Sequence, residues 1–240
     1  MNKVIENIFN KTLLSDLRFI HEENAIIAWS KRSRFKIIIP KKIDERIAYL
    51  SGAIIGDGNI TITKRKVTKY PRLRLTIFNA SKKYLSFLNK EFYCVFKING
   101  KITKKKDKNC YVLTINQKLV VLYFLQIIKM HPGKKSNLEI PIAVRNRDLF
   151  RFFVAGLYDT DGFFSKTFGI MMNGSNYGFL RDVSALLEEY YNISSRKLFF
   201  GCLNTDKGPR FRSQAQIRTR DIQKFINTMP LKHNKYGPMV

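Results

Sequence analysis

The sequence predicts an α+β fold built from two pseudo-symmetric αββαββα repeats. The chain has 240 residues, of which 45% are apolar, so it can bury a large core. Two similar nonapeptides, Leu50–Gly58 and Val154–Gly162, stand far apart in the chain. The segments that follow them also match in order and pattern, and such internal similarity predicts a duplicated structural unit.

The later segments define the elements of each repeat. Ile77–Ser81 resembles Met171–Ser175, and Leu113–Asn116 resembles Ala215–Arg218. Each segment precedes apolar residues at helical spacing, and the short apolar runs before them have the length of strands. Each half therefore reads helix, strand, strand, helix, strand, strand, helix.

The domain boundaries follow from this repeat. We expect an N-terminal extension (1–44), a first repeat (45–130), a linker (131–148) and a second repeat (149–240). Pro132, Gly133 and Pro141 punctuate the linker. In the extension, residues 4–9 have helical spacing and Phe35–Pro40 resembles a short strand.

The charge of the chain points to a polyanionic partner. Lys and Arg number 44 and Asp and Glu 18, which gives a net charge of +26. A compact protein with this charge repels itself, and nucleic acid is the usual compensating partner. An anionic membrane surface and a merely solvated basic surface are the alternatives.

The cysteines and the apolar runs limit the location. Cys94, Cys110 and Cys202 form neither a zinc-binding spacing nor an even disulfide set. The N-terminus lacks the apolar stretch of a signal peptide, and no apolar run reaches membrane-spanning length. We expect an intracellular monomer, cytoplasmic, nucleoid-associated or organellar, that is neither secreted nor membrane-bound.

The two nonapeptides have the pattern of helices that end at an aspartate. Gly52 and Gly56 share one helical face, and Gly156 and Thr160 occupy the same places in the second motif. Small residues on one face allow two helix backbones to approach closely. Packing of the two helices would bring Asp57 and Asp161 together at their C-terminal ends. Gly58 and Gly162 follow directly and suit positive-φ helix caps.

A pair of adjacent carboxylates predicts a metal site. Two carboxylates repel each other unless a cation lies between them, and Mg²⁺ prefers oxygen ligands. We expect Mg²⁺ at Asp57 and Asp161, with Mn²⁺ or Ca²⁺ able to substitute for binding, in a site suited to phosphodiester hydrolysis. The alternative is that each Asp-Gly pair is simply a helix stop.

The paired nonapeptides resemble the LAGLIDADG motif of a family of homing endonucleases. The Gly133–Ser136 segment before Ile140 and Pro141 is also similar to members of that family. The resemblance implies a saddle-shaped DNA-binding β-surface with packed motif helices between the repeats. It also implies metal-dependent cleavage of both strands of a long asymmetric site. Asp57 and Asp161 would bind the metal through their carboxylates.

The resemblance also implies roles for residues around the carboxylates. The carbonyl groups of Gly56 and Thr160 would face the metal. Ile55 departs from the pattern, whereas the second motif has the acidic Asp159 there, at a position usually outside the metal shell.

Further catalytic candidates lie after the strands. Asn79 and Asn173 stand where relatives carry a polar residue that positions the attacking water, although either asparagine could instead cap the following helix. Arg218 and Asn116 stand where relatives often carry a lysine, with Lys118 as a nearby substitute in the first half. This difference predicts unequal cutting of the two strands.

The polar faces of the strands support a DNA-binding surface. In the run 72–77, alternation turns Leu73, Leu75 and Ile77 inward and the polar residues outward. Arg, Gln and Thr side chains suit contacts with base edges, and basic loops suit phosphates. The candidate DNA contacts are Thr61, Thr63, Lys64, Arg65, Arg72, Arg74, Thr76, Thr114, Lys166, Arg212, Gln214 and Gln216. An ordinary solvated sheet face is the alternative. The N-terminal extension is either an additional DNA-contacting arm or a structural brace.

Three other functions remain open. An intron maturase that binds intron RNA could use the same scaffold and charge, as could a non-cutting DNA-binding regulator. Retention of both Asp57 and Asp161 favours the nuclease. A basic membrane-surface protein would need an amphipathic lysine-rich helix, which the sequence does not show convincingly.

Overall fold

The first repeat contains the seven elements that the sequence predicts, in the predicted order. The computed structural model describes residues 17–30, 35–63, 71–106, 109–133, 138–165, 169–174, 176–205 and 208–233. The elements of the first repeat are α3 (Glu45–Asp57), β4 (Gly58–Thr63), β5 (Arg72–Asn79), α4 (Lys82–Phe96), β6 (Lys101–Lys104), β7 (Tyr111–Ile115) and α5 (Lys118–Gln126).

The second repeat has the same succession of elements. They are α6 (Arg147–Asp161), β8 (Gly162–Ser165), β9 (Gly169–Gly174), α7 (Tyr177–Tyr191), β10 (Ser195–Thr205), β11 (Gly208–Ile217) and α8 (Ile222–Thr228). Two short 3₁₀ turns accompany them, η2 (Ile142–Val144) and η3 (Thr219–Asp221). The predicted α+β fold with two αββαββα units is therefore confirmed.

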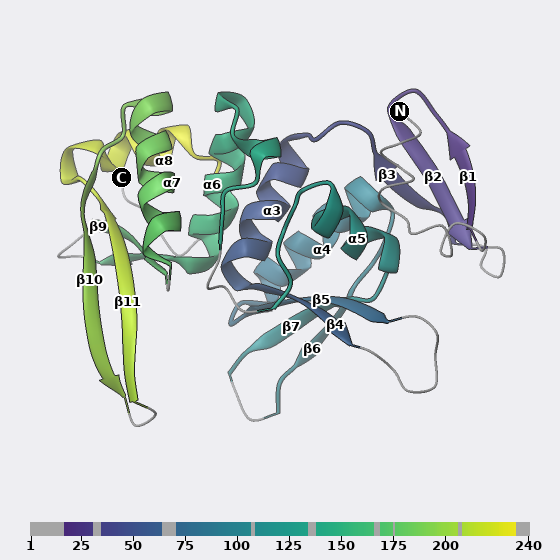
Figure 1. Ribbon diagram of the computed structural model, residues 1–240, viewed down its shortest axis with the longest axis horizontal. Helices are drawn as coiled ribbons and strands as arrows, with labels where there is room; N and C mark the ends of the chain where they lie inside the picture. Colours follow the sequence, from purple (N-terminus) through teal and green to yellow (C-terminus); the bar gives the residue numbers. More distant parts are fainter. Residues whose placement is uncertain are drawn as a thin grey trace.

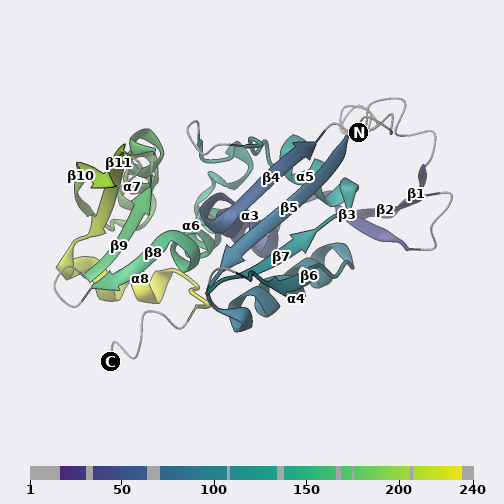
Figure 2. The ribbon, with the colours of Figure 1, turned by 90° about the horizontal axis from the view of Figure 1, so that it is seen from below.

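The two main sheets share one topology. The first has the strand order β4-β5-β7-β6 and the second the equivalent order β8-β9-β11-β10, with antiparallel pairing in both. In Figure 1, α3 and α6 lie side by side at the centre, with one sheet on each side of the pair. Figure 2 views the molecule from below, with strands β4 and β5 in front of α3.

Glycines at the seam allow the central helices to pack closely. A Cβ atom on Gly52 would lie 1.9 Å from the carbonyl oxygen of Phe153, and one on Gly156 would lie 2.1 Å from that of Tyr49. Side chains larger than hydrogen are therefore excluded at both positions, as the small-residue pattern predicts. The helices run parallel, so that both end on the same side of the molecule.

The glycines that follow the helices differ from our expectation. Gly58 has φ −85° and ψ 161°, and Gly162 has φ −78° and ψ 157°, so both are extended and neither is a positive-φ cap. Each helix passes directly into a strand, which requires extended backbone. At Gly58 the glycine is needed for space, because a Cβ atom there would lie 2.4 Å from the carbonyl oxygen of Ile54.

The described part of the N-terminal extension forms a small sheet of its own. Its strands are β1 (Leu17–His21), β2 (Ala25–Ser30) and β3 (Ile37–Pro40), paired antiparallel in that order. One face buries Ile26, Ala28, Ile37 and Ile39 in the same core as the first repeat. Strand β3 packs against α4 and α5. This packing is that of a brace, and β1 and β2 were not predicted.

The main core fills the space between each sheet and its helices. In α6, apolar residues such as Phe150, Phe153 and Leu157 are almost fully buried, and α5 buries Val120 and Phe124. Among the helices of the described residues, none combines the length and hydrophobicity needed to cross a membrane.

Candidate metal and nucleic-acid site

The two motif carboxylates lie at the shared end of the central helices. Asp57 is the last residue of α3 and Asp161 the last residue of α6, and both side chains are half-buried. A Cβ atom built on Gly56 would lie 3.5 Å from the carboxyl carbon of Asp161. The second carboxylate therefore reaches across the seam to the residue that precedes the first, as the glycine pattern predicts.

Thr160 fills the space that Gly56 leaves open. Its hydroxyl oxygen lies 1.8 Å from the position that a Gly56 Cβ atom would take. The same hydroxyl donates to the carbonyl oxygens of Gly156 (3.0 Å) and Leu157 (2.8 Å) within its own helix. The Thr160 side chain is thus a packing element at the seam.

Asn79 holds the first carboxylate. Its amide nitrogen donates to the Oδ2 atom of Asp57 at 2.9 Å, and its Oδ1 atom accepts from the backbone nitrogen of Ser81 at 2.9 Å. Ser81, and not Asn79, caps α4 by accepting from the backbone nitrogen of Tyr84. The capping alternative for Asn79 is therefore excluded, because this side chain faces the carboxylate.

Asn173 does not occupy the equivalent position, although the two sequences suggest that it does. Gly58 pairs with Ile77 in the first sheet, whereas its counterpart Gly162 pairs with Met172 in the second. The residue equivalent to Asn79 is therefore Gly174, one position further along. A one-residue shift of register turns a side chain to the opposite face of the sheet.

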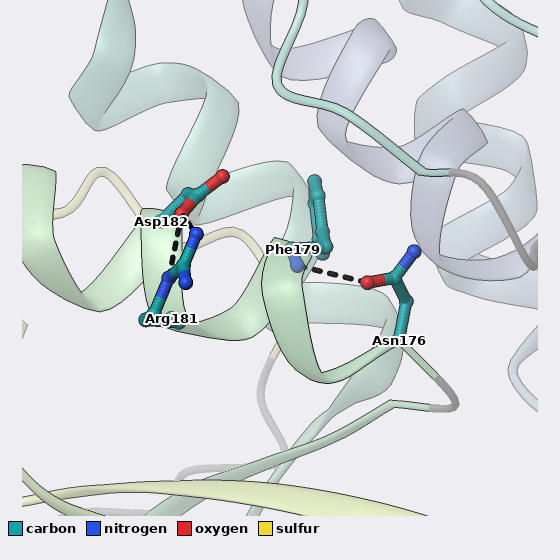
Figure 3. A network of polar contacts seen from close by, with 4 residues as sticks. All are labelled: Asn176, Phe179, Arg181 and Asp182. Carbon is teal, nitrogen blue, oxygen red and sulfur yellow. Dashed lines mark hydrogen bonds and ion pairs between the residues drawn. The ribbon is translucent and has the colours of Figure 1, made fainter.

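The Asn173 side chain consequently lies on the outer face of its sheet. Its Oδ1 atom accepts from the amide nitrogen of Gln214 at 2.8 Å, and the two residues are register partners in β9 and β11. Helix α7 has its own cap, since Asn176 accepts from the backbone nitrogen of Phe179 at 2.9 Å (Figure 3). Asn173 and Gln214 thus form a hydrogen-bonded amide pair on the outer face of the second sheet, which also carries Gln216.

The last three catalytic candidates lie near the ends of the sheets. Asn116 is exposed just after β7, and Lys118 is the first residue of α5. Burial lowers the pKa of the Lys118 ammonium group. Arg218 is exposed after β11 and, with Arg196, Thr219 and Arg220, lines a surface depression of about 650 Å³. Each half therefore has cationic groups near the end of its last strand.

The outer face of the first sheet has the predicted alternation. Leu73, Leu75 and Ile77 are almost fully buried, whereas Arg72 is exposed and Arg74 and Thr76 are half-buried. The Nε atom of Arg74 is inaccessible to solvent and makes no hydrogen bond within the described part of the chain. Burial of an unpaired donor is costly, which makes this Nε atom a candidate donor to a ligand.

Other predicted contact residues lie on the same outer faces. Thr61 and Thr114 are half-buried, Thr63 is exposed, and Gln214 and Gln216 alternate with the buried Ser213, Ala215 and Ile217. The ammonium group of Lys105 lies 5.3 Å from the ring centroid of Phe78, which brings positive charge to this face. Lys64, Arg65 and Lys166 and the side chain of Arg212 lie outside the described residues.

Sequence reasoning missed a buried hydrogen-bond network behind the carboxylates. Asp159 is fully buried and accepts from the Tyr49 hydroxyl (2.5 Å) and from the backbone nitrogen of Lys232 (2.6 Å). The Tyr49 hydroxyl also lies 3.1 Å from that of Tyr84. The acid in the second motif was the only available signal, since the distant Lys232 follows no pattern.

The donor set at the helix ends fits a hard divalent cation. The described residues hold no group of three His, Cys, Asp or Glu side chains arranged for a metal, so a closed zinc-type site is absent there. Asp57 and Asp161 offer two carboxylates, and helix ends add backbone carbonyl groups. Mg²⁺ usually binds through one or two carboxylates and takes further oxygens from water or phosphate.

Comparison with known sequences identifies a domain in the first half. Residues 44–129 match the model of the LAGLIDADG-like domain. A glutamine–fructose-6-phosphate aminotransferase of Methanocaldococcus jannaschii is 29% identical over 161 residues. That alignment covers 65% of this chain but only 14% of the aminotransferase, so the chain spans a small part of that relative.

Comparison with solved structures identifies the fold. Variants of the homing endonuclease I-DmoI align over 79% of this chain and 97% of theirs, with a TM-score of 0.57 and 24% identity. I-DmoI in complex with DNA and Ca aligns over 79% of this chain and 91% of its own, with a TM-score of 0.56 and 24% identity. Residues 44–129 therefore form a LAGLIDADG-like domain, and the chain shares the fold of these homing endonuclease structures.

Proposed function

We propose that this protein is a site-specific endonuclease that hydrolyses both strands of a long asymmetric DNA site with a divalent metal. The observation that carries the proposal is the meeting of Asp57 and Asp161 at the end of a glycine seam. Both helices pass directly into sheets whose outer faces carry Arg, Thr and Gln side chains. We infer that residues 45–130 and 149–240 act as the two halves of one monomeric unit.

Different residues of the chain would bind the metal, bind the duplex and stabilise the phosphate charge. Asp57 and Asp161 would hold Mg²⁺, and the backbone carbonyl groups of Gly56 and Thr160 would add oxygen ligands. The bound metal would supply Lewis-acid stabilisation and activate water. Arg74, Thr76 and Gln216 would bind the duplex from the sheets, where a strand ribbon fits the major groove. Arg218 and Lys118 would counter phosphate charge near the strand ends.

The test is cleavage of plasmid libraries that carry long randomised inserts. The purified chain would be incubated with each library and Mg²⁺, and the cut ends sequenced. Discrete Mg²⁺-dependent cuts that EDTA abolishes are the expected result, with Mn²⁺ as an active substitute and Ca²⁺ supporting binding. Salt-sensitive DNA binding without any cut would contradict the nuclease and favour a regulator, and preferential binding of structured intron RNA would favour a maturase.

Different groups surround the two carboxylates, so we expect the two strands to be cut at different rates. Asn79 donates to Asp57, whereas Gly174 at the equivalent place has no side chain to offer. Asn79→Ala should slow cleavage by about 10- to 100-fold, since a hydrogen bond to a charged group is worth about 1.5–3 kcal/mol. Strand-resolved denaturing gels should show one strand affected more than the other.

Asn173→Ala is the matched control for this asymmetry. Because Asn173 pairs with Gln214 on the outer face, its loss should alter which bases are tolerated. On the best site, the cleavage rate of Asn173→Ala should stay within about tenfold of that of the unmodified chain. A tenfold loss is the smallest that we expect for Asn79→Ala. Equal slowing of both strands by the two variants would show that the register difference has no catalytic effect.

Arg74 and Lys101 should differ in what they recognise. Arg74→Ala removes a central outward guanidinium group and should cost about 1–3 kcal/mol of discrimination at one base pair. Lys101, exposed on the edge strand β6 and paired with the outward-facing Thr114, is placed for phosphate, and Lys101→Ala should lower the slope of log K against log salt by about 1. Binding titrations at several salt concentrations, on matched and mismatched sites, measure both effects.

A further inference from the structure

The buried Asp159 carboxylate joins three separate parts of the chain. It lies in the last turn of α6, two residues before Asp161, and is fully buried. Its Oδ2 atom accepts from Tyr49, which lies 110 residues earlier in α3, and from the backbone of Lys232, 73 residues later. Removal of a carboxylate from water is costly unless hydrogen bonds replace the lost solvation. The hydrogen bonds from Tyr49 and Lys232 therefore compensate for the burial of the Asp159 carboxylate.

The contacts continue from Tyr49 into the first repeat. The Tyr49 hydroxyl lies 3.1 Å from that of Tyr84, which stands in the first turn of α4. The ring of His233 lies 4.8 Å from that of Tyr84, centroid to centroid. Burial raises the pKa of Tyr49 far above its usual range, and the nearby Tyr84 and Asp159 raise it further. Tyr49 therefore stays protonated and donates.

The position of Asp159 on its helix decides what these bonds control. Successive residues turn by about 100° around a helix, so Asp159 and Asp161 point to nearly opposite sides of α6. Hydrogen bonds that fix the Asp159 direction therefore also fix the direction in which Asp161 projects. The glycine seam sets how close the helices are, and the hydrogen bonds of Asp159 add a restraint on the rotation of the last turn.

We propose that Asp159 is a positioning residue, which locks the rotation of the last turn of α6 and so aims Asp161 at Asp57. The proposal rests on the proposed metal site at this pair. The lock exists only in the second half, because the first motif has the apolar Ile55 at the matching place. It also makes the segment Met229–His233 part of the site's support, since the backbone of Lys232 donates a hydrogen bond to Asp159.

The test compares two tyrosine variants that make the same chemical change. Tyr49→Phe removes the hydroxyl that holds Asp159. Tyr123→Phe is the control, because the Tyr123 hydroxyl is also buried and makes no hydrogen bond within the described residues. The full-length proteins would be compared in Mn²⁺ affinity by calorimetry, in exchange of the Lys232 amide by NMR, and in kcat and KM of DNA cleavage.

Loss of the lock should loosen the metal site without weakening DNA binding. In Tyr49→Phe we expect Mn²⁺ affinity to fall by about tenfold or more, as for groups that orient metal ligands. The kcat should fall by about tenfold while KM stays within about twofold, because misplacement of a ligand acts on the chemical step. The Lys232 amide should exchange faster. Tyr123→Phe should leave all four quantities close to those of the unmodified chain.

The outcomes separate this proposal from the endonuclease proposal. If the unmodified chain binds Mn²⁺ but cuts no DNA, the endonuclease proposal fails, while Mn²⁺ affinity and amide exchange still test the lock. If Tyr49→Phe only lowers thermal stability, with Mn²⁺ affinity and kcat equal to those of Tyr123→Phe, the network is purely structural and the lock is overturned. Absence of Mn²⁺ binding by the unmodified chain would overturn the lock as well.

Discussion

Asp57→Asn and Asp161→Asn should each lower the rate of double-strand cleavage by about 10³-fold or more. Asparagine keeps the shape of the side chain, so the helices should still pack, but it removes the negative charge that would hold the metal. A bound metal contributes several kcal/mol of charge stabilisation, and each 1.36 kcal/mol is about tenfold in rate. Single-turnover cleavage of the target identified from the libraries measures the loss.

The effect must be separated from a loss of DNA binding or folding. Gel-shift titrations in Ca²⁺ should show affinities for the same target within about tenfold of the unmodified chain, because phosphate contacts dominate the affinity. Asp182→Asn is the control, since this carboxylate lies on α7 and pairs with Arg181 at the surface (Figure 3). Retention of full cleavage by either motif variant would contradict the assignment of the carboxylates.

Gly52→Ala should destabilise the whole molecule by about 3 kcal/mol, at the upper end of overpacking effects. The added methyl group would lie 1.9 Å from the Phe153 carbonyl oxygen and 2.8 Å from the Leu157 nitrogen, both backbone atoms that cannot rotate away. The helices must therefore separate, which also draws Asp57 and Asp161 apart. Urea unfolding measures the free energy, and cleavage should fall with it even under conditions where the variant is folded.

Gly178→Ala provides the matched change in an open position. Gly178 lies in the first turn of α7, and a methyl group there would meet only the Asn176 amide oxygen at an ordinary 3.5 Å. Alanine favours helix over glycine by up to about 1 kcal/mol, so this variant should be equally or more stable. Equal destabilisation by Gly52→Ala and Gly178→Ala would mean that the seam does not limit helix packing.

Much of the fold could be predicted from the sequence, because the apolar alternation and the glycine spacing are local patterns, and similar segments occur in both repeats. Period-2 alternation around Leu75 predicted the buried face of β5, and the glycine spacing in the two motifs predicted the central helix pair. The position of Asp161 beside Gly56 follows from that pair. The alternation depends on residues that are neighbours in the chain. The position of Asp161 depends on a single contact, the packing of the two similar motif helices.

The errors arose where distant pairing decides the outcome. Asn79 and Asn173 look equivalent when letters are matched, but hydrogen bonding of each strand to its neighbours sets the register, and Gly174 takes the equivalent place. Similarly, Gly58 is extended because β4 begins at once. The role of Asp159 depends on Lys232, which folds back from the other end of the chain, and no local pattern could reveal it.

The glycine seam also has a consequence for synthesis of the chain on the ribosome. Helix α3 is complete at residue 57, but the helix that covers its glycine face is finished only at residue 161. At a translation rate of about 5–20 residues per second, the glycine face of α3 stays without its partner helix for roughly 5–20 s. During this time two nascent chains could pair through the same face, so slow or crowded translation should favour chain-swapped dimers over monomers.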